Sequence, residues 1–169
     1  MTLRTLTGVA VGLLACASSA FGAETRHYEG CVSSYQSGQP QMVVCTFESP
    51  YSCNMIRLYG GSRVVSTSGS SASLARGEFV SVDAMMQSGQ PVATVVRVYP
   101  NRIVRTVSGF KASQAQSVQS GLNRVPGVRS VRLNSSLGEV LITYSASSTS
   151  PAAIVRQAAR RGIQLALPG

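Results

Sequence analysis

The sequence predicts an α+β protein with two domains: a small all-β barrel, OB-like, followed by a ferredoxin-like domain with the element order βαββαβ. Residues 24–100 hold short runs rich in Val, Tyr, Phe and Thr between turn residues, which is typical of strands, and no helical periodicity. Residues 101–169 contain two stretches with apolar residues three and four positions apart, which indicates helices between further strands. The expected domains are therefore 24–100 and 101–169, joined by a short linker at 99–101.

Residues 1–23 have the pattern of a secretory signal peptide. Arg4 supplies the basic start, an apolar run extends from residue 6 to residue 17, and small residues follow it. Neither this run nor any later stretch reaches about 20 apolar residues, the length of a membrane-spanning helix. The pattern predicts export to the bacterial periplasm, with cleavage after Ala20. A second interpretation stays open, because Leu13-Leu14-Ala15-Cys16 resembles a lipobox, in which Cys16 would be lipidated.

Two hairpins and six strand-like segments are expected in the first domain. The pentapeptide Gln-Ser-Gly-Gln-Pro occurs at 36–40 and again at 87–91, with a strand-like run on either side each time. Its Gly supplies the positive φ of a tight hairpin loop. Symmetric pairing in the second hairpin sets Val82 opposite Val96. A Ser-rich stretch, 66–73, predicts a loop. The six segments are 27–36, 41–48, 55–61, 62–67, 77–86 and 91–100.

Three cysteines remain beyond the leader, and export permits a disulfide. Pairing symmetric about Gly38 in the first hairpin places Cys31 directly opposite Cys45, close enough for a bridge. The sequence therefore favours a Cys31–Cys45 disulfide, which would add on the order of 3 kcal/mol by closing a loop of about 15 residues. A register shifted by one residue would instead make Cys53 the partner of either.

The second domain has clear helix boundaries. Pro126-Gly127 ends the first helix, whereas Ser150 caps the second, Pro151 occupies its first position and Gly162 stops it. The expected elements are a strand at 102–108, a helix at 112–125, strands at 128–134 and 138–144, a helix at 151–161 and a strand at 163–167.

Residues 102–167 carry the marks of a known family in Val107-x-Gly109, Leu122-x-x-Val125-Pro126-Gly127-Val128, Gly138-Glu139-Val140 and Gly162-Ile163. With these marks the segment resembles the heavy-metal-associated domain of copper chaperones and mercury scavengers. The resemblance implies the ferredoxin-like fold. It also implies that the family's metal loop, Gly-Met-x-Cys-x-x-Cys, falls on residues 109–115.

The loop of this chain departs from the family pattern at both ligands, because Ala112 and Ala115 stand where the family has cysteines. Phe110 replaces the methionine, and Lys111 places a cation beside the loop. Alanine cannot coordinate a metal, so the metal activity of the family does not transfer to this loop. A helix N-terminus beside Lys111 remains able to attract an anion.

A soft-metal site elsewhere is the alternative. Cys53 and Met55 form a Cys-x-Met pair, and thiolate and thioether ligands suit Cu(I). His27, Met42, Met85 and Met86 are further donors, although methionine more often fills irregular cores. No cofactor is expected.

The sequence does not predict an enzyme. Beyond the leader it has one His, His27, and one Asp, Asp83, and neither a phosphate loop nor a dinucleotide fingerprint. A His27–Asp83–Ser constellation is the one catalytic grouping left open, and no local spacing supports it.

Charge is concentrated in the second half of the chain. Residues 97–169 hold nine Arg, one Lys and a single acid, Glu139, which indicates an anionic partner. Few aromatic residues accompany them, so nucleic acid is not favoured. The leading hypothesis is an exported binding protein that contacts an envelope protein or an anionic lipid or polysaccharide through Arg156, Arg160, Arg161 and Lys111. A solvated basic surface is the simpler interpretation.

Overall fold

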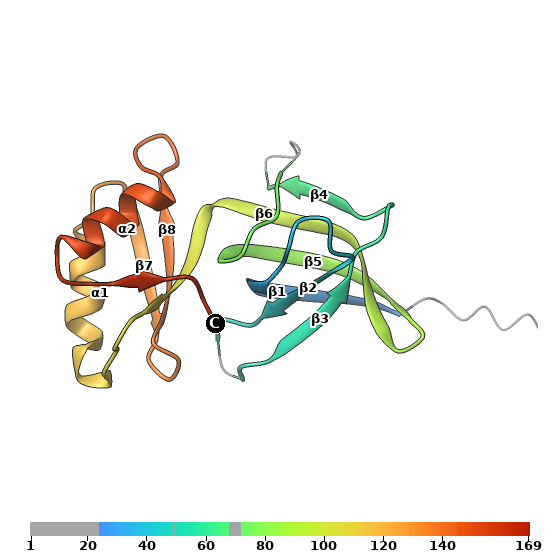
Figure 1. Cartoon of the computed structure of the whole chain (residues 1–169), viewed down its shortest axis with the longest axis horizontal. Helices are drawn as coiled ribbons and strands as arrows, with labels where there is room; N and C mark the ends of the chain where they lie inside the picture. The colour runs from blue at the N-terminus through green and yellow to red at the C-terminus, as the bar shows by residue number, and fades with distance from the viewer. Residues whose placement is uncertain (1–23, 49, 68–71) are drawn as a thin grey trace, which may run out of the picture.

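The computed structural model of the chain describes residues 24–48, 50–67 and 72–169, so the predicted leader and the lipidation of Cys16 lie outside the described residues. The structure is rich in β-strands and has two α-helices, which agrees with the α+β class (Figure 1). The elements are β1 (Thr25–Ser34), β2 (Gln41–Cys45), β3 (Cys53–Arg57), β4 (Arg63–Ser66), β5 (Glu78–Gln87), β6 (Gln90–Val107), the 3-10 helix η1 (Ala112–Gln114), α1 (Ala115–Asn123), β7 (Val128–Asn134), β8 (Glu139–Tyr144), α2 (Pro151–Ala159) and β9 (Leu165–Ala166).

Five strands of the first half form a closed barrel. β3, β2, β1, β5 and β6 follow one another by antiparallel pairing, and a parallel contact of β3 with β6, at Arg57 and Val92, closes the ring. β4 adds to β6 in parallel. Alternate residues of each strand point inward, as period-2 patterning requires. The buried interior consists of Val32, Met42, Val44, Ile56, Val80, Val82, Ala84, Ala93, Val96 and Val98.

Both expected hairpins are present, and the residue pairing predicted for each of them is confirmed. Cys31 pairs with Cys45 in β1–β2, and Val82 pairs with Val96 in β5–β6. The tips differ, however. The second hairpin turns on Ser88 and Gly89, both with positive φ, as a two-residue loop of type I′ requires. The first hairpin has a longer loop with Gly38 at φ 83°.

β6 is one strand of 18 residues where the sequence predicts two strands and a short linker at 99–101. In Figure 1 it runs along the barrel and then bends into the C-terminal unit. Pro100, which has no N–H to donate, lies where the pairing of β5 with β6 shifts register, so the missing donor breaks no regular ladder. The Tyr144 hydroxyl donates to the Pro100 carbonyl oxygen at 2.7 Å. The strand is therefore continuous across the expected linker.

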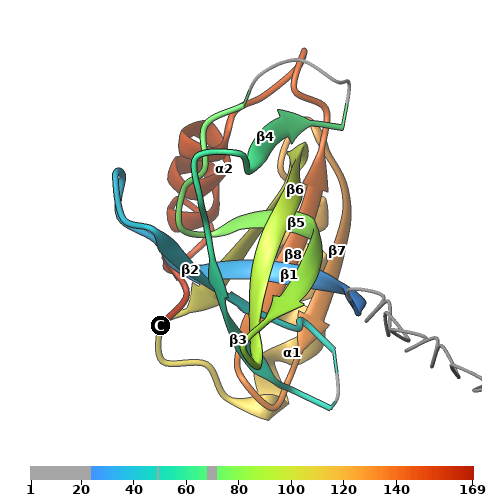
Figure 2. The same cartoon turned by 90° about the vertical axis from the view of Figure 1, so that its right-hand side faces the viewer.

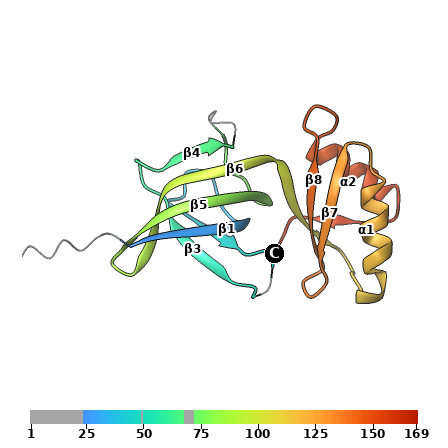
Figure 3. The same ribbon diagram turned by 180° about the vertical axis from the view of Figure 1, so that it is seen from behind.

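The C-terminal unit has the order β6-α1-β7-β8-α2-β9, with strands arranged β9-β6-β8-β7. Both helices cover the sheet face that is turned away from the barrel (Figure 3). They bury Val118, Leu122, Ile154 and Ala158 in one apolar core with residues of the sheet. The first helix is shorter than expected, because residues 112–114 form a 3-10 turn and Ala112 is exposed rather than part of the buried face.

A third, smaller core joins the barrel to the C-terminal unit. Cys31 and Phe79 from the barrel pack with Phe47, Val104 and Leu141. The Asn134 side chain of β7 donates to the carbonyl oxygen of Phe47 at 2.8 Å. Viewed from the barrel end, β3, β5 and β6 lie in front of the C-terminal unit (Figure 2). We call this contact region the junction. Among the described residues, no helix is long and apolar enough to cross a membrane.

Candidate functional site

The loop at 109–115 has the shape of a turn that enters a helix, but it carries no ligand side chains. Gly109 has φ 66°, and the backbone N–H of Lys111 donates to Gln114 Oε1 at 3.1 Å. Phe110 packs into the C-terminal core. Ala112 begins the 3-10 turn and Ala115 begins α1, the first exposed and the second half-buried. Methyl groups therefore occupy both positions at which the heavy-metal-associated pattern has metal-binding cysteines.

The three cysteines that the structure describes lie in a row across adjacent strands. Cys31 pairs with Cys45, and Cys45 pairs in turn with Cys53. The disulfide joins Cys45 to Cys53, with a Cα–Cα distance of 4.0 Å, and Cys31 is a free, buried thiol. The predicted Cys31–Cys45 bridge is thus corrected, although its register is right. Cys45 has a cysteine opposite it on each of its two neighbouring strands. The prediction depended on the symmetry of the first hairpin, which contains β1 and β2 but not β3.

The environment of Cys31 suppresses its thiolate form. Its side chain is 3% exposed within the junction core. Burial raises the pKa of the Cys31 thiol to about 12, and the Glu139 carboxylate contributes in the same direction. Burial also raises the pKa of Glu139 above its ordinary value. As it stands, Cys31 is a poor nucleophile and a poor metal ligand.

The sulfur side chains predicted as soft-metal donors do not converge on one site. Cys53 is tied up in the disulfide, whereas Met55, two residues further along β3, is 56% exposed. Met42 is buried inside the barrel, and Met85 and Met86 alternate along β5. Within the described parts of the chain, no three His, Cys, Asp or Glu side chains are grouped so as to hold a metal ion.

A charged cluster forms on the outer face of the barrel. His27 Nδ1 lies 2.9 Å from Asp83 Oδ1, and Arg97 Nη1 donates to Asp83 Oδ2 at 2.5 Å. Both hydrogen bonds lower the pKa of the Asp83 carboxyl, and the one from Arg97 has the larger effect. The His27–Asp83 part of the open catalytic grouping is therefore present. The third side chain in the cluster, which contacts Asp83, is that of Arg97 rather than of a serine. The predicted pairing of Val82 with Val96 could have indicated that Arg97 lies near Asp83.

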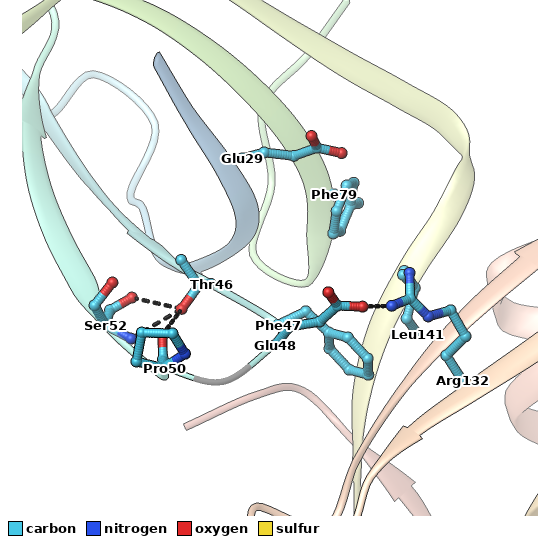
Figure 4. A pocket seen from close by; sticks show the side chains of 9 residues that line it. All are labelled: Glu29, Thr46, Phe47, Glu48, Pro50, Ser52, Phe79, Arg132 and Leu141. Carbon is cyan, nitrogen blue, oxygen red and sulfur yellow. Dashed lines mark hydrogen bonds and ion pairs between the residues drawn. The ribbon is translucent and has the colours of Figure 1, made fainter. Parts of the chain in front are cut away.

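A cavity of about 480 Å³ opens at the junction (Figure 4). Phe47, Phe79 and Leu141 give it apolar walls, and the charged side chains around them include Glu29, Glu48 and Arg132. Glu48 is ion-paired with Arg132, as the dashed line in Figure 4 marks. No local pattern in the sequence predicts this cavity, because its lining comes from elements that are distant in the sequence.

Arg102 completes the charged surroundings of the cavity. Its guanidinium lies 4.6 Å from the centre of the Tyr99 ring and 5.6 Å from that of Phe79. Arg102 Nη1 is also 3.8 Å from Glu29 Oε1. Glu29 and Glu48 therefore each have a guanidinium partner, so the charges at this cavity are balanced internally.

The basic residues predicted to bind a partner do not form one site. Arg156 lines a groove of about 500 Å³ with Arg105 and apolar residues of the C-terminal segment. Arg161 points the other way, because its Nη1 donates to the Gln157 carbonyl oxygen at 3.2 Å and its Nη2 to that of Arg124 at 3.1 Å.

Arg156, Arg160 and Lys111 are exposed. None of the three forms a salt bridge with any carboxylate in the parts of the chain that the structure describes. The single acid of the C-terminal unit, Glu139, is buried and close to Cys31. The structure records no contact that joins Lys111 to the arginines of α2, so an anion-binding surface would be centred on α2.

Comparison with known proteins finds structural likeness without a family assignment. No family model matches the chain, and no curated protein matches it either. Oxidized MerP from Ralstonia metallidurans CH34 is 17% identical over 40% of this chain and 96% of its own, with a TM-score of 0.37. The mercury-bound form of MerP, the periplasmic protein of the bacterial mercury detoxification system, is 20% identical over 41% of this chain and 97% of its own, with a TM-score of 0.36.

A copper form of CopA from Bacillus subtilis is 30% identical over 40% of this chain and 91% of its own, with a TM-score of 0.36. The structural neighbours are thus heavy-metal-associated domains, and each is matched by about two fifths of this chain. With TM-scores below 0.5, these likenesses establish nothing further about its function.

Proposed function

We propose that this chain is an exported, non-enzymatic binding protein of the bacterial envelope. Its first half is an OB-like barrel, and its second half is a ferredoxin-like domain of the heavy-metal-associated type that has lost its metal ligands at Ala112 and Ala115. The domain binds an anionic lipid, polysaccharide or protein surface through its basic residues. The observation that carries this proposal is the exposure of Arg156 and Arg160 on α2 without a carboxylate partner in the described chain.

The charge distribution supports an anionic partner. Guanidinium groups that lack a counter-charge within the protein create a positive potential that attracts anions and speeds association. Arg161 contributes to this potential, but its hydrogen bonds to α1 and α2 give it a structural task as well. Arg156 and Arg160 are therefore the residues on which binding can be tested without disturbing the fold.

The test is co-sedimentation of the purified chain with phosphatidylglycerol vesicles, with phosphatidylcholine vesicles and with bacterial envelope fragments. Wild type should bind the anionic vesicles or the fragments, and added salt should weaken this binding. The double variant Arg156→Glu/Arg160→Glu should lose it. The matched control is Arg57→Glu/Arg63→Glu, which reverses two exposed charges on the barrel and should bind as wild type. Unchanged binding of the α2 variant would refute the proposal.

Soft-metal binding by the barrel is the second candidate, and a single observation favours it. Cys53 and Met55 are both exposed and lie two residues apart on β3, so their side chains share a face of the strand. The disulfide must be reduced before Cys53 can act as a thiolate. Reduced protein should then take up copper(I), mercury(II) or zinc(II), and Cys53→Ala should remove the metal. Retention of metal by Cys53→Ala would exclude this site.

A further inference from the structure

The three cysteines of β1, β2 and β3 lie directly opposite one another, although a single disulfide needs only two opposed residues. Directly opposed residues of neighbouring strands project from the same face of a sheet. Cys31, Cys45 and Cys53 are opposed in two successive steps, on β1, β2 and β3. Cys45 therefore lies between a sulfur to which it is bonded and a strand that carries a free thiol. In thiol–disulfide exchange a thiolate attacks one sulfur of a disulfide and displaces the other. The order of the strands places the free thiol and the leaving sulfur on opposite sides of Cys45.

We propose that Cys31, Cys45 and Cys53 form a thiol–disulfide exchange site, in which the bridge moves from Cys45–Cys53 to Cys31–Cys45 and releases Cys53 as an exposed thiol. The Cys31 thiol gives its proton to water, and the resulting thiolate attacks the Cys45 sulfur and forms the new S–S bond. The Cys45–Cys53 bond breaks, its electron pair leaves with the Cys53 sulfur, and that thiolate takes a proton from water. One disulfide exists before and after the step, so no oxidant or reductant is consumed.

The junction controls whether this exchange occurs. Cys31 is enclosed by Phe47, Phe79, Val104 and Leu141, so its thiol is out of reach of water while the barrel and the C-terminal unit are in contact. The charged groups that influence the thiol are Glu139, Arg105 and Arg76, and burial outweighs them in keeping it protonated. Separation at the junction hydrates Cys31 and restores an ordinary thiol. The position of the bridge therefore records whether the junction has opened.

Exchange also changes what is exposed. Cys53 lies in an exposed position on β3, whereas Cys31 is buried, so the reaction transfers the free thiol from the interior to the surface. It also replaces the covalent link between β2 and β3 with one between β1 and β2.

The first experiment tests whether Cys31 can reach Cys45 to form a disulfide. It uses two matched variants of the chain from residue 24 onward, each checked for folding by circular dichroism. Cys53→Ser leaves Cys31 and Cys45 on adjacent strands. Cys45→Ser leaves Cys31 and Cys53 two strand spacings apart, about 9–10 Å, which exceeds the roughly 7 Å Cα separation that a bridge tolerates. After reduction and exposure to oxidised glutathione, peptide mapping should find an intramolecular bridge in Cys53→Ser and none in Cys45→Ser. A folded Cys53→Ser without a bridge would overturn the proposal, as would equal bridging in both variants.

The second experiment follows the exchange in the wild-type chain, with Cys31→Ser as its control. Wild type is incubated in urea below its unfolding transition, treated with iodoacetamide, quenched with acid and mapped. Labelling should rise from background at Cys53, together with a Cys31–Cys45 bridge, and Cys31→Ser should lose this labelling completely. Labelling of Cys31 with an intact Cys45–Cys53 bridge would overturn the proposal, and so would the absence of labelling up to global unfolding.

Discussion

The guanidinium of Arg161 reaches across from the end of α2 to the carbonyl oxygen of Arg124, the residue that caps α1, at 3.1 Å. A second hydrogen bond, to the carbonyl oxygen of Gln157, anchors the same side chain to its own helix. Carbonyl groups in the last turn of a helix have no partner within the helix, and a cation there interacts favourably with the helix dipole. Arg161 therefore ties the C-terminal ends of both helices together.

Arg161→Ala should lower the free energy of unfolding by about 1–2 kcal/mol, because its exposed guanidinium donates to two backbone carbonyl oxygens and to the side-chain oxygen of Gln157. Arg160→Ala is the matched control, since Arg160 is exposed and its side chain has no hydrogen bond to any residue that the structure describes. It should change stability by less than about 0.5 kcal/mol. Urea unfolding followed by circular dichroism measures both. Equal effects of the two substitutions would contradict the structural role of Arg161.

The left-handed glycines Gly109 and Gly138 allow a second matched comparison. Both have φ 66°, but a Cβ added to Gly138 would lie 3.0 Å from the Cβ of Phe110, whereas one added to Gly109 would meet nothing within 4 Å. Gly109→Ala should cost about 1–2 kcal/mol, the price of a left-handed conformation alone. Gly138→Ala should cost roughly 1 kcal/mol more, because Phe110 must shift within the core. Thermal unfolding of both variants tests this. An equal loss of stability in the two would show that Phe110 can shift without an energetic cost.

Local patterns located the elements of this chain better than they located its contacts. The structure has the predicted N-cap at Ser150 and the predicted pairing of Cys31 with Cys45. Both depend on residues that are close together in the sequence. The choice of Cys53 as the bonded partner depends on the pairing of β2 with β3, for which the sequence offers no symmetric turn. Arg97 reaches Asp83 only because β5 and β6 pair in register.

The expected linker illustrates a second limit of the sequence. Pro100 favours a break in a strand, yet β6 continues through it. The break is avoided because β5 shifts register at this point and because the Tyr144 hydroxyl binds the Pro100 carbonyl oxygen. Tyr144 lies 44 residues further along the chain. The junction core and its cavity arise from the same kind of distant contact, so no local pattern predicts them.

Loss of the Cys45–Cys53 bridge should destabilise the chain. The bridge joins residues eight positions apart, and closing a loop of that size is worth about 2–3 kcal/mol in the chain-entropy model. In a Cys31→Ser background, where no replacement bridge can form, Cys53→Ser should lower the free energy of unfolding by about this amount, because Cys53 is exposed and serine fills its position without a cavity. Guanidinium unfolding of Cys31→Ser and Cys31→Ser/Cys53→Ser under non-reducing conditions makes the measurement. With dithiothreitol present, the two variants should unfold at nearly the same midpoint, and a difference that survived reduction would have another origin.

Glu139 and Asp83 should affect the pH dependence of stability in opposite directions. Burial raises the pKa of Glu139 in the folded state, so its ionised form opposes folding at neutral pH. This penalty disappears as the pH falls through the raised pKa and towards the unfolded value. Glu139→Gln should therefore stabilise the chain at pH 7, and the gain should shrink as the solution approaches pH 4.

Asp83 has a lowered pKa, chiefly because Arg97 and then His27 bind its ionised form. Its stabilising effect is complete above the pKa of the unfolded state and is lost as the pH falls through the lowered pKa of the folded state. Asp83→Asn should consequently destabilise the chain at pH 7 and have progressively less effect in acid. Urea midpoints for wild type and both variants between about pH 2 and pH 7 provide the test, because the contribution of Asp83 is lost only below the ordinary carboxyl pKa of about 3.9. If the two variants differed from wild type with the same sign at pH 7, the assigned environments of these carboxyl groups would be wrong.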